Sequence, residues 1–241
     1  MPRVWNDLLG KPGIKILQDT EMFNFSLDSI LLANFVNITK RCKNICDLCC
    51  GNAPIPMYLT LKTKANIVGV EIQEESFELA NLSIEENQMN EQIKMINSDL
   101  KGISSILGKS KFDIVTCNPP YYKLGDFRVN PNDKKAIARH EISATLDDIV
   151  KEASLLLNSG GDFVMVHRPT RLVEILEVLK QYHLEPKRLQ FIHAKVDSEA
   201  TSILIEAKKD GNSGLRILKP LYVYDENGKW FSDIIKIYNG E

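Results

Sequence analysis

The sequence predicts an α/β fold in which a mainly parallel sheet of seven strands carries helices on both faces. Short apolar runs of strand length alternate with longer segments whose apolar residues recur every three or four positions, as in β-α units around a parallel sheet. Polar residues also follow four successive strand runs, at the sheet edge where open α/β folds bind ligands. With 241 residues, 44% of them hydrophobic, the chain is long enough for one large domain of this class.

Four strand runs and two helices predict the first half of the sheet. The strand runs are Asn44–Leu48, 65–72, Ile93–Asn97 and Phe112–Cys117. A helix is expected at 53–61 and a second at 73–88, where Phe77, Ala80 and Ile84 share one face. Each of these helices connects two strand runs, so the strands are expected to lie parallel.

The second half continues the alternation. A helix at 146–157 leads through the turn Ser159-Gly160-Gly161 into a strand at 162–167. A helix at 169–181 precedes two strands, near 187–193 and 200–207. The structureless stretch of about 123–143 is long enough to be a lid or a binding loop.

The two ends of the chain are expected to add small elements to this core. Residues 1–43 read as an N-terminal extension with one amphipathic segment, 26–36. Residues 211–241 read as a tail with a β-hairpin, because β-rich runs at 221–224 and 230–237 flank Asn227-Gly228. The whole tail is expected to belong to the same domain as the core at 44–210.

Composition excludes several classes of protein. No apolar run reaches the ~18 residues of a membrane span, and the first residues lack the apolar core of a secretion signal, so a cytoplasmic location is expected. Cys46 and Cys49 form a CxxC pair without a second pair or a nearby histidine. Reduced, unligated thiols and no metal are therefore expected.

The segment Asn118-Pro119-Pro120-Tyr121 carries the most chemical information. It follows a buried strand run, and its asparagine and rigid prolines offer carbonyl acceptors beyond the end of that strand. Tyr121 adds a flat apolar face. Such a set suits a planar amine, whose N–H groups bond to the Asn118 and Pro119 oxygens while its ring stacks on Tyr121.

Three more polar elements end the preceding strands. Asp47 and Gly51 belong to a tight turn of small residues after the first strand, where the backbone can approach a ligand closely. Glu71 ends the second strand and can accept both hydroxyls of a ribose, and Asp99 follows the third. A nicotinamide-binding domain is disfavoured for two reasons. The turn lacks the third glycine of the fingerprint that such domains share, and the chemistry of a dehydrogenase does not require Asn-Pro-Pro-Tyr.

In this order the four elements resemble class I S-adenosylmethionine-dependent methyltransferases, a Rossmann-like fold. The bacterial tRNA1(Val) adenine-N6-methyltransferase family, which modifies A37 beside the anticodon, is the most similar. Its N-terminal cofactor segment resembles 23–33, its Arg-His-Glu element resembles Arg139-His140-Glu141, and its closing strands resemble 202–208 and 219–224. The turn departs from the glycine-rich consensus at Cys49 and Ala53.

The resemblance implies a role for each site residue. Asp28 would lie near the methionine end of S-adenosylmethionine, Asp47 and Gly51 under its methionine and ribose, and Glu71 at its ribose hydroxyls. Asp99 and Leu100 would hold its adenine. Asn118 and Pro119 would hold the target amine and Tyr121 the target base. The extension 1–43 would pack on this cofactor site.

The resemblance also implies a tRNA partner, bound near its anticodon stem-loop, and neither a membrane nor DNA is expected. Net charge is −2, but positive charge gathers after the Asn-Pro-Pro-Tyr segment, where it would guide a polyanion. The candidates for RNA binding are Lys123, Arg128, Lys134, Lys135, Arg139 and His140. Two other substrates suit the same pocket, a protein glutamine amide and the N2 of a ribosomal RNA guanine; a non-catalytic RNA-binding protein on this fold is a further alternative.

Overall fold

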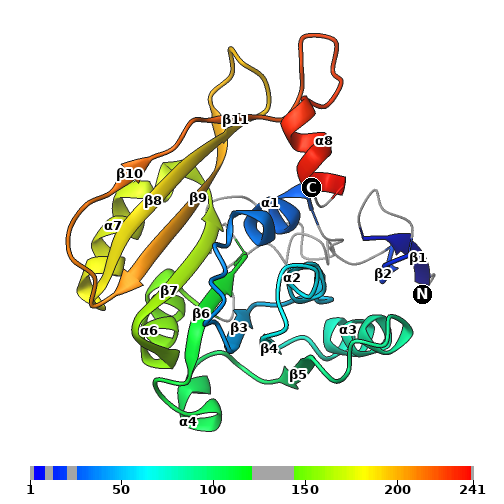
Figure 1. Ribbon diagram of the computed structural model, residues 1–241, viewed down its shortest axis with the longest axis vertical. Helices are drawn as coiled ribbons and strands as arrows, with labels where there is room; N and C mark the ends of the chain where they lie inside the picture. Colours follow the sequence, from blue (N-terminus) through cyan, green and yellow to red (C-terminus); the bar gives the residue numbers. More distant parts are fainter. Residues whose placement is uncertain (1–2, 9–12, 21–25, 121–143, 240–241) are drawn as a thin grey trace, which may run out of the picture.

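The computed structural model describes residues 3–8, 13–20, 26–120 and 144–239. Its centre is one twisted sheet, with helices packed on each side (Figure 1). The neighbours across the main sheet are β10 (Arg216–Ile217), β8 (Leu184–His193), β9 (Ala200–Lys209), β7 (Leu157–His167), β6 (Phe112–Cys117), β3 (Asn44–Leu48), β4 (Asn66–Glu71) and β5 (Ile93–Asn97). The short strand β11 (Leu221–Tyr222) also pairs with β8.

The mainly parallel α/β architecture is confirmed, whereas the main sheet has nine strands in the described residues and not the expected seven. Of the seven longer strands only β9 runs against the others, because its partners β7 and β8 both pair with it antiparallel. The two additional strands, β10 and β11, have two residues each and pair with β8 in parallel. They form where the chain after residue 214 runs along the outer edge of the sheet, and runs that short leave no periodic signal in a sequence.

Two hydrophobic clusters, one on each side of the sheet, hold the helices in place. The first contains residues of α1 (Leu27–Phe35), α2 (Pro54–Leu59), α3 (Glu74–Glu86) and α8 (Ser232–Asn239). The second contains residues of α4 (Ile103–Leu107), α6 (Leu146–Leu156) and α7 (Leu172–Gln181), which follows the short helix η1 (Pro169–Arg171). Alternate residues of a strand enter opposite clusters, as Ile67 and Val68 of β4 do, which explains the continuous apolar runs.

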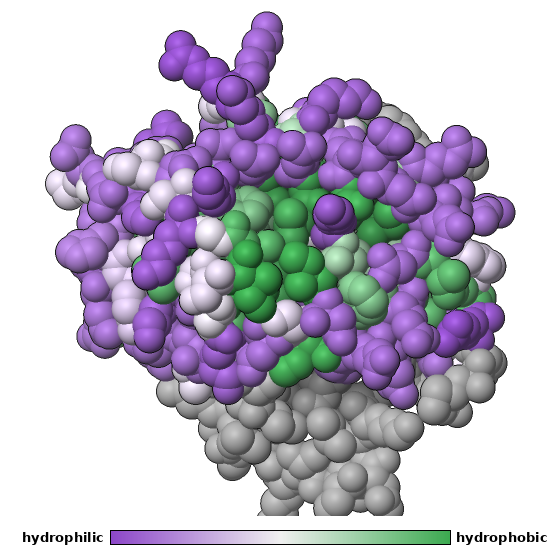
Figure 2. All heavy atoms as spheres, turned by 90° about the horizontal axis from the view of Figure 1, so that it is seen from below, coloured by the Kyte–Doolittle hydropathy of each residue, from purple (hydrophilic) through white to green (hydrophobic). Residues whose placement is uncertain are grey.

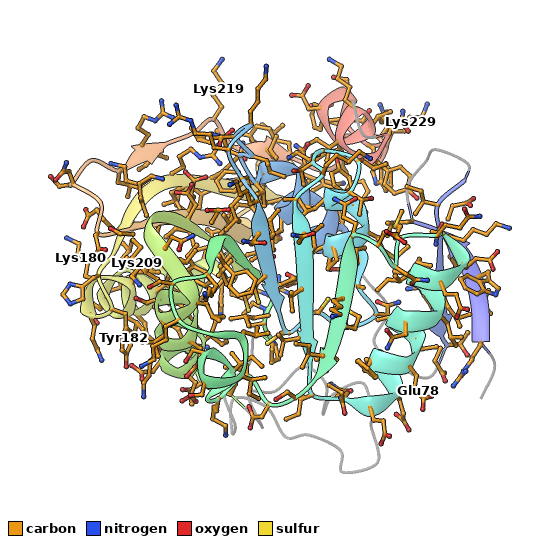
Figure 3. All side chains as sticks on the ribbon, turned by 60° about the horizontal axis from the view of Figure 1, so that its bottom comes forward. Glu78, Lys180, Tyr182, Lys209, Lys219 and Lys229 are labelled. Atoms are coloured by element: carbon orange, nitrogen blue, oxygen red, sulfur yellow. The ribbon has the colours of Figure 1, made fainter. Side chains whose placement is uncertain are left out.

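The cover over β3, β4 and β5 differs between the two sides. Figure 3 shows these strands side by side with no helix drawn in front of them. Val68 and Ile96 on this side are only partly buried, and the view from below shows an apolar area framed by hydrophilic side chains (Figure 2). The helix that follows β5, α4, has only five residues, so this side has less cover than the side of α1, α2 and α3.

The N-terminal segment forms a structure that the sequence did not predict. Strands β1 (Arg3–Asp7) and β2 (Lys15–Asp19) pair antiparallel as a separate two-stranded sheet. Their other contacts are to side chains: Ser83 on α3 accepts the Leu17 N–H at 2.9 Å, and the Asn52 amide donates to the Leu17 carbonyl at 3.0 Å. The small sheet is thereby attached beside the turn that follows β3.

The expected C-terminal hairpin is wrong in its second half. Tyr224 and Trp230 form a single antiparallel bridge around Asn227-Gly228, but residues Ser232–Asn239 are the helix α8. Ile234 and Ile237, three positions apart, are buried in the first cluster, which is the spacing of one helix face. Among the described residues, no helix is long and apolar enough to cross a membrane.

The carboxyl end of α1 is fixed by two cations. The Lys62 ammonium donates hydrogen bonds to the carbonyls of Ala33, Asn34 and Val36 at 3.1, 2.8 and 2.8 Å. The Arg188 guanidinium donates to the Phe35 carbonyl at 2.7 Å and lies 4.3 Å from the centre of the Phe35 ring. These groups satisfy carbonyls that the last helical turn leaves open, and they join α1 to the sheet.

We expect Arg188→Ala to lower the free energy of unfolding by about 3 kcal/mol. The substitution leaves the largely buried Glu206 carboxylate without the Arg188 guanidinium, its ion-pair partner at 2.6 Å. Urea denaturation of wild type and variant measures this difference. The matched control is Lys187→Ala, which removes only a bond to the Asn212 carbonyl and should cost less than about 1 kcal/mol. Equal losses in the two variants would contradict the role given to Arg188.

Candidate active site

The polar residues predicted for the site converge on one edge of the sheet. In the parallel register Leu48 of β3 is opposite Val70 of β4 and Cys117 of β6, so the residues that follow these strands leave the sheet at the same level. Glu71 of β4 is likewise opposite Asn97 of β5. The carboxyl ends of β6, β3, β4 and β5 therefore lie next to one another along one edge of the sheet, which is where open α/β sheets bind ligands.

The turn after β3 adopts a compact, left-handed path. Cys49, Gly51 and Ala53 have φ angles of 56°, 57° and 68°. A side chain placed on Gly51 would meet nothing within 4 Å, so the space beside its backbone is open. Positive φ is costly for the two residues that carry a Cβ. The turn is therefore a strained segment whose open side is available for close approach by a ligand.

Asp47 is a fully buried carboxylate with one oxygen unpaired. Its Oδ1 accepts a 2.6 Å hydrogen bond from the Thr116 hydroxyl on the neighbouring strand. Its Oδ2 has no hydrogen-bond partner in the described part of the chain. Burial raises the pKa of Asp47 to about 7, against the lowering effects of the Thr116 hydroxyl and the Cys50 thiol. An unpaired buried acceptor of this kind suits a cationic or hydrogen-bond-donating ligand group.

Glu71 joins the turn to the second strand. Its Oε2 accepts the Gly51 N–H and its Oε1 accepts the Gln73 N–H, both at 2.8 Å. Burial raises the pKa of Glu71, and these backbone hydrogen bonds oppose the rise. A carboxylate has about four lone-pair sites, so Glu71 keeps acceptor capacity beyond these backbone bonds.

Asp99 and Leu100 follow β5 on the outer side of the site. Asp99 accepts the Lys101 N–H at 2.9 Å, and its carboxylate lies 3.6 Å from the Lys101 ammonium. Its side chain remains 39% exposed, whereas Leu100 is buried. An apolar side chain beside a reachable acceptor is the combination that an adenine ring with its N6 amine requires.

Asn118 is held in place by α1. The Asn118 amide donates a 3.0 Å hydrogen bond to the hydroxyl of Ser29, which is itself buried, and Pro119 is buried next to it. The neighbouring Asp28 accepts a 3.1 Å hydrogen bond from Ser202 at the start of β9. The first turn of α1 thus contacts both β6 and β9 and fixes how Asn118 is presented.

Several candidates from the sequence lie outside the described residues. They are Tyr121 and the RNA-binding set Lys123, Arg128, Lys134, Lys135, Arg139 and His140. Their roles stay predictions from the sequence.

The structure adds supporting residues that sequence reasoning missed. Thr116, Ser29 and Asn52 orient Asp47, Asn118 and the turn through hydrogen bonds between residues far apart in the chain. Ser29 directly follows the candidate Asp28, which is a weak signal. Thr116 could be found only from the strand register, in which it is opposite Asp47.

Two kinds of reactive side chain near the site are held in neutral form. Burial lowers the pKa of His167, at the end of β7, to about 3, and its Nδ1 accepts the Arg168 N–H at 2.8 Å. Burial raises the pKa of the Cys46, Cys50 and Cys117 thiols. These groups therefore serve packing and local hydrogen bonding at neutral pH. Within the described residues no cluster of three His, Cys, Asp or Glu could hold a metal ion.

Comparison with protein families adds the decisive observation. The family model of the methyltransferase small domain matches residues 24–192, which contain α1, the turn, Glu71, Asp99 and Asn118. The chain belongs to the methyltransferase small domain family.

Individual relatives and solved structures agree with membership of this family. A protein of Phocaeicola vulgatus named tRNA1(Val) (adenine(37)-N6)-methyltransferase is 25% identical over 181 residues, which cover 75% of each chain. Among solved structures, a predicted O-methyltransferase of Agrobacterium tumefaciens has 22% identity and a TM-score of 0.72, covering 88% of this chain and 96% of its own.

A geranyl diphosphate C-methyltransferase of Streptomyces coelicolor A3(2), solved with S-adenosyl-L-homocysteine, has 12% identity and a TM-score of 0.53. The match covers 75% of this chain and 79% of that one. At these identities the two solved structures show the fold of class I methyltransferases, which the chain shares.

The raised pKa of Asp47 predicts a specific pH dependence of stability in the ligand-free protein. The folded state keeps the Asp47 proton up to about pH 7, whereas the unfolded chain releases it near 3.8. Stability from this group is therefore present below pH 4 and is lost as pH rises to 7. Asp47→Asn should remove the loss, so that from pH 4.5 to 8 it gains up to about 4 kcal/mol on wild type.

Urea denaturation of wild type and Asp47→Asn at several pH values measures this difference. Asp197→Asn, at an exposed position, is the control and should follow wild type throughout. A constant difference between wild type and Asp47→Asn across the pH range would show that Asp47 is already ionised in the folded protein.

Proposed function

We propose that this protein transfers a methyl group from S-adenosylmethionine to N6 of an adenosine in tRNA, namely A37 next to the anticodon of tRNA1(Val). The observation that carries the proposal is that Asn118 and Pro119 directly follow β6 and that the Asn118 amide is hydrogen-bonded to Ser29. The strand next to it leads into the open turn at Gly51. Family membership and the name of the Phocaeicola vulgatus relative support the choice of substrate.

The residues at the strand ends fit S-adenosylmethionine part by part. The Asp47 oxygen without a partner among the described residues suits the ammonium of the methionine part. Asp28, which the family resemblance assigns to the same part of the cofactor, directly precedes the Ser29 that binds Asn118. The remaining acceptor positions of Glu71 suit the two ribose hydroxyls, beside the Gly51 backbone. Asp99 and Leu100 suit the adenine. When bound, the cofactor supplies a methyl group on a positively charged sulfur, which is already activated for transfer.

The chain's own task is to position and polarise the acceptor amine. The N6 nitrogen of adenine is a weak nucleophile because its lone pair is delocalised into the ring. Acceptors at Asn118 and Pro119 would bind both amine protons and favour a pyramidal nitrogen as positive charge develops on it. Holding this nitrogen in line with the methyl group supplies the rest of the acceleration. The proton is then released to solvent, and His167, neutral with a pKa of about 3, is no base for it.

The substrate base must leave its stack to reach Asn118, which costs least in a single-stranded loop. An anticodon loop meets this condition. From the sequence, Tyr121 would stack on the target base and Lys123, Arg128, Lys134, Lys135, Arg139 and His140 would contact the RNA backbone. A glutamine amide or a guanine N2 would suit the same acceptors, and the names of the relatives favour adenosine in tRNA over both.

We expect methyl transfer from labelled S-adenosylmethionine to an unmodified transcript of valine tRNA, and none to the same transcript with A37 replaced by G. Filter-binding or scintillation counting of the purified RNA measures the label. Equal label in both transcripts would keep the methyltransferase and move the target nucleotide. Absence of label in both, with cofactor still bound, would exclude this tRNA as substrate.

We expect Asn118→Ala to lower kcat at least about 100-fold, because one of the two acceptors that polarise the amine is lost. Binding of S-adenosylhomocysteine, measured by calorimetry, should stay within about threefold of wild type. Asn66→Ala, at the amino end of β4, two strands away from β6 and on the opposite edge of the sheet, is the control and should keep full activity. Loss of ligand binding in parallel with activity would assign Asn118 to the cofactor rather than to the amine.

A further inference from the structure

Besides Asp47 Oδ2, a second buried polar atom near the turn lacks a partner. The amide nitrogen Nε2 of Gln18, on β2, has no hydrogen-bond partner among the residues that the structure describes, although Gln18 is only 6% exposed. Leaving a buried N–H donor unpaired costs about as much as a lost hydrogen bond, so such groups are rare in folded proteins unless a ligand pairs with them. The two unpaired atoms are of opposite kind, since one is an anionic acceptor and the other a neutral donor.

Strand β2 is attached to the turn that we assign to the cofactor. The Leu17 carbonyl, one residue before Gln18, accepts a 3.0 Å hydrogen bond from Asn52 in a buried position. Asn52 directly follows Gly51, whose N–H binds Glu71. On its other side β2 is fixed to α3, because the Leu17 N–H donates to Ser83 at 2.9 Å. Gln18 is therefore the next residue after one that is hydrogen-bonded to the turn, which keeps its backbone close to that turn.

The orientation of the Gln18 amide is also set. Asn6 on β1 donates a 2.6 Å hydrogen bond to the Gln18 oxygen Oε1. The antiparallel register, in which Asn6 is opposite Ile16 and Gln18 opposite Val4, brings these two side chains to one face of the small sheet. Because the Gln18 oxygen binds Asn6 and the amide is planar, the two N–H donors on Nε2 point away from Asn6.

The methionine part of S-adenosylmethionine carries one ammonium and one carboxylate on the same carbon atom. The ammonium calls for an acceptor such as Asp47. The carboxylate, close beside it, calls for a donor without negative charge, because an acidic residue there would repel it. We propose that Gln18 Nε2 donates a hydrogen bond to this carboxylate while Asp47 binds the ammonium. The inference rests on the proposed cofactor and gives the β1–β2 sheet a task in recognising its amino-acid part.

The test compares two ligands that differ only at this end. S-adenosylhomocysteine carries the ammonium and carboxylate, whereas 5′-methylthioadenosine lacks both and keeps the adenosine. Calorimetry on wild type at pH 7.5 should show that the first binds more tightly. In Gln18→Leu we expect the affinity for S-adenosylhomocysteine to fall about tenfold, as for a lost hydrogen bond to a charged group. The affinity for 5′-methylthioadenosine should stay within twofold.

Two further variants sharpen the result. Gln18→Glu keeps the shape but adds a negative charge, so it should weaken S-adenosylhomocysteine binding more than Gln18→Leu does and again spare the shorter ligand. Gln190→Leu, on β8, removes a bond to the Lys219 carbonyl and should leave both affinities unchanged. If Gln18→Leu does not fold in a ligand-free melting experiment, Gln18→Met and Gln18→Glu provide the same comparison.

Equal weakening of both ligands in the Gln18 variants, or no weakening of either, would overturn the assignment of Gln18. A wild-type protein that binds neither ligand would overturn the cofactor and this inference together. A wild-type protein that distinguishes the two ligands as expected, yet methylates no tRNA, would leave the inference standing and reject only the proposed substrate.

Discussion

Burial of two carboxylates at the ends of adjacent strands is the constraint on which the site depends. Asp47 and Glu71 are both almost inaccessible to solvent, and burial raises the pKa of each. Glu71 recovers part of this cost through the backbone N–H groups of Gly51 and Gln73, and in doing so it fixes the turn. Asp47 recovers less, since in the described part of the chain its partners are the Thr116 hydroxyl, at 2.6 Å, and the weakly donating Cys50 thiol. The ligand-free fold therefore carries an unfavourable group that a cationic ligand would relieve, a common compromise at binding sites.

The helix α1 links the sheet to Asn118, the residue proposed to bind the target amine. It has only nine residues, too few to be stable alone, and its shape depends on what holds its two ends. Lys62 and Arg188 bind its last carbonyls, and Ser29 and Asp28 at its start meet Asn118 and Ser202. The position of Asn118 is thus determined by contacts at the far end of α1 as well as by β6. Loss of Arg188 is for this reason expected to lower stability and also to loosen the helix that holds Asn118.

The sequence predicted elements where one local signal was sufficient. The bounds of β3, β5 and β6 are those expected, because each is a short apolar run ended by polar or small residues. Glu71 and Asn118 were singled out for the same reason, since Glu71 is the last residue of one strand and Asn118 directly follows another.

Contacts between distant segments could not be found in this way. The bond between Asn118 and Ser29 joins residues 89 positions apart, and the bond between Asn52 and Leu17 joins residues 35 apart. The tail was misjudged because Asn227-Gly228 suggested a hairpin, although Ile234 and Ile237 already had helical spacing. Burial against α1 and α2, which only the assembled fold provides, decided in favour of the helix.

The departure of the turn from a glycine-rich pattern has a structural compensation in the next strand. Cys50 has a side chain at a position of the turn, and this side chain is buried against Gly69 of β4. A Cβ at Gly69 would overlap the sulfur atoms of Cys50 and Met95, so a larger residue at this strand position would require both side chains to move. The backbone of Cys50 is meanwhile bonded to the Val70 carbonyl at 3.0 Å. Because the bulk of the turn is turned toward the core, its outer side at Gly51 stays open. The turn thus keeps an open side at Gly51 although Cys49 and Ala53 stand where the consensus has glycine.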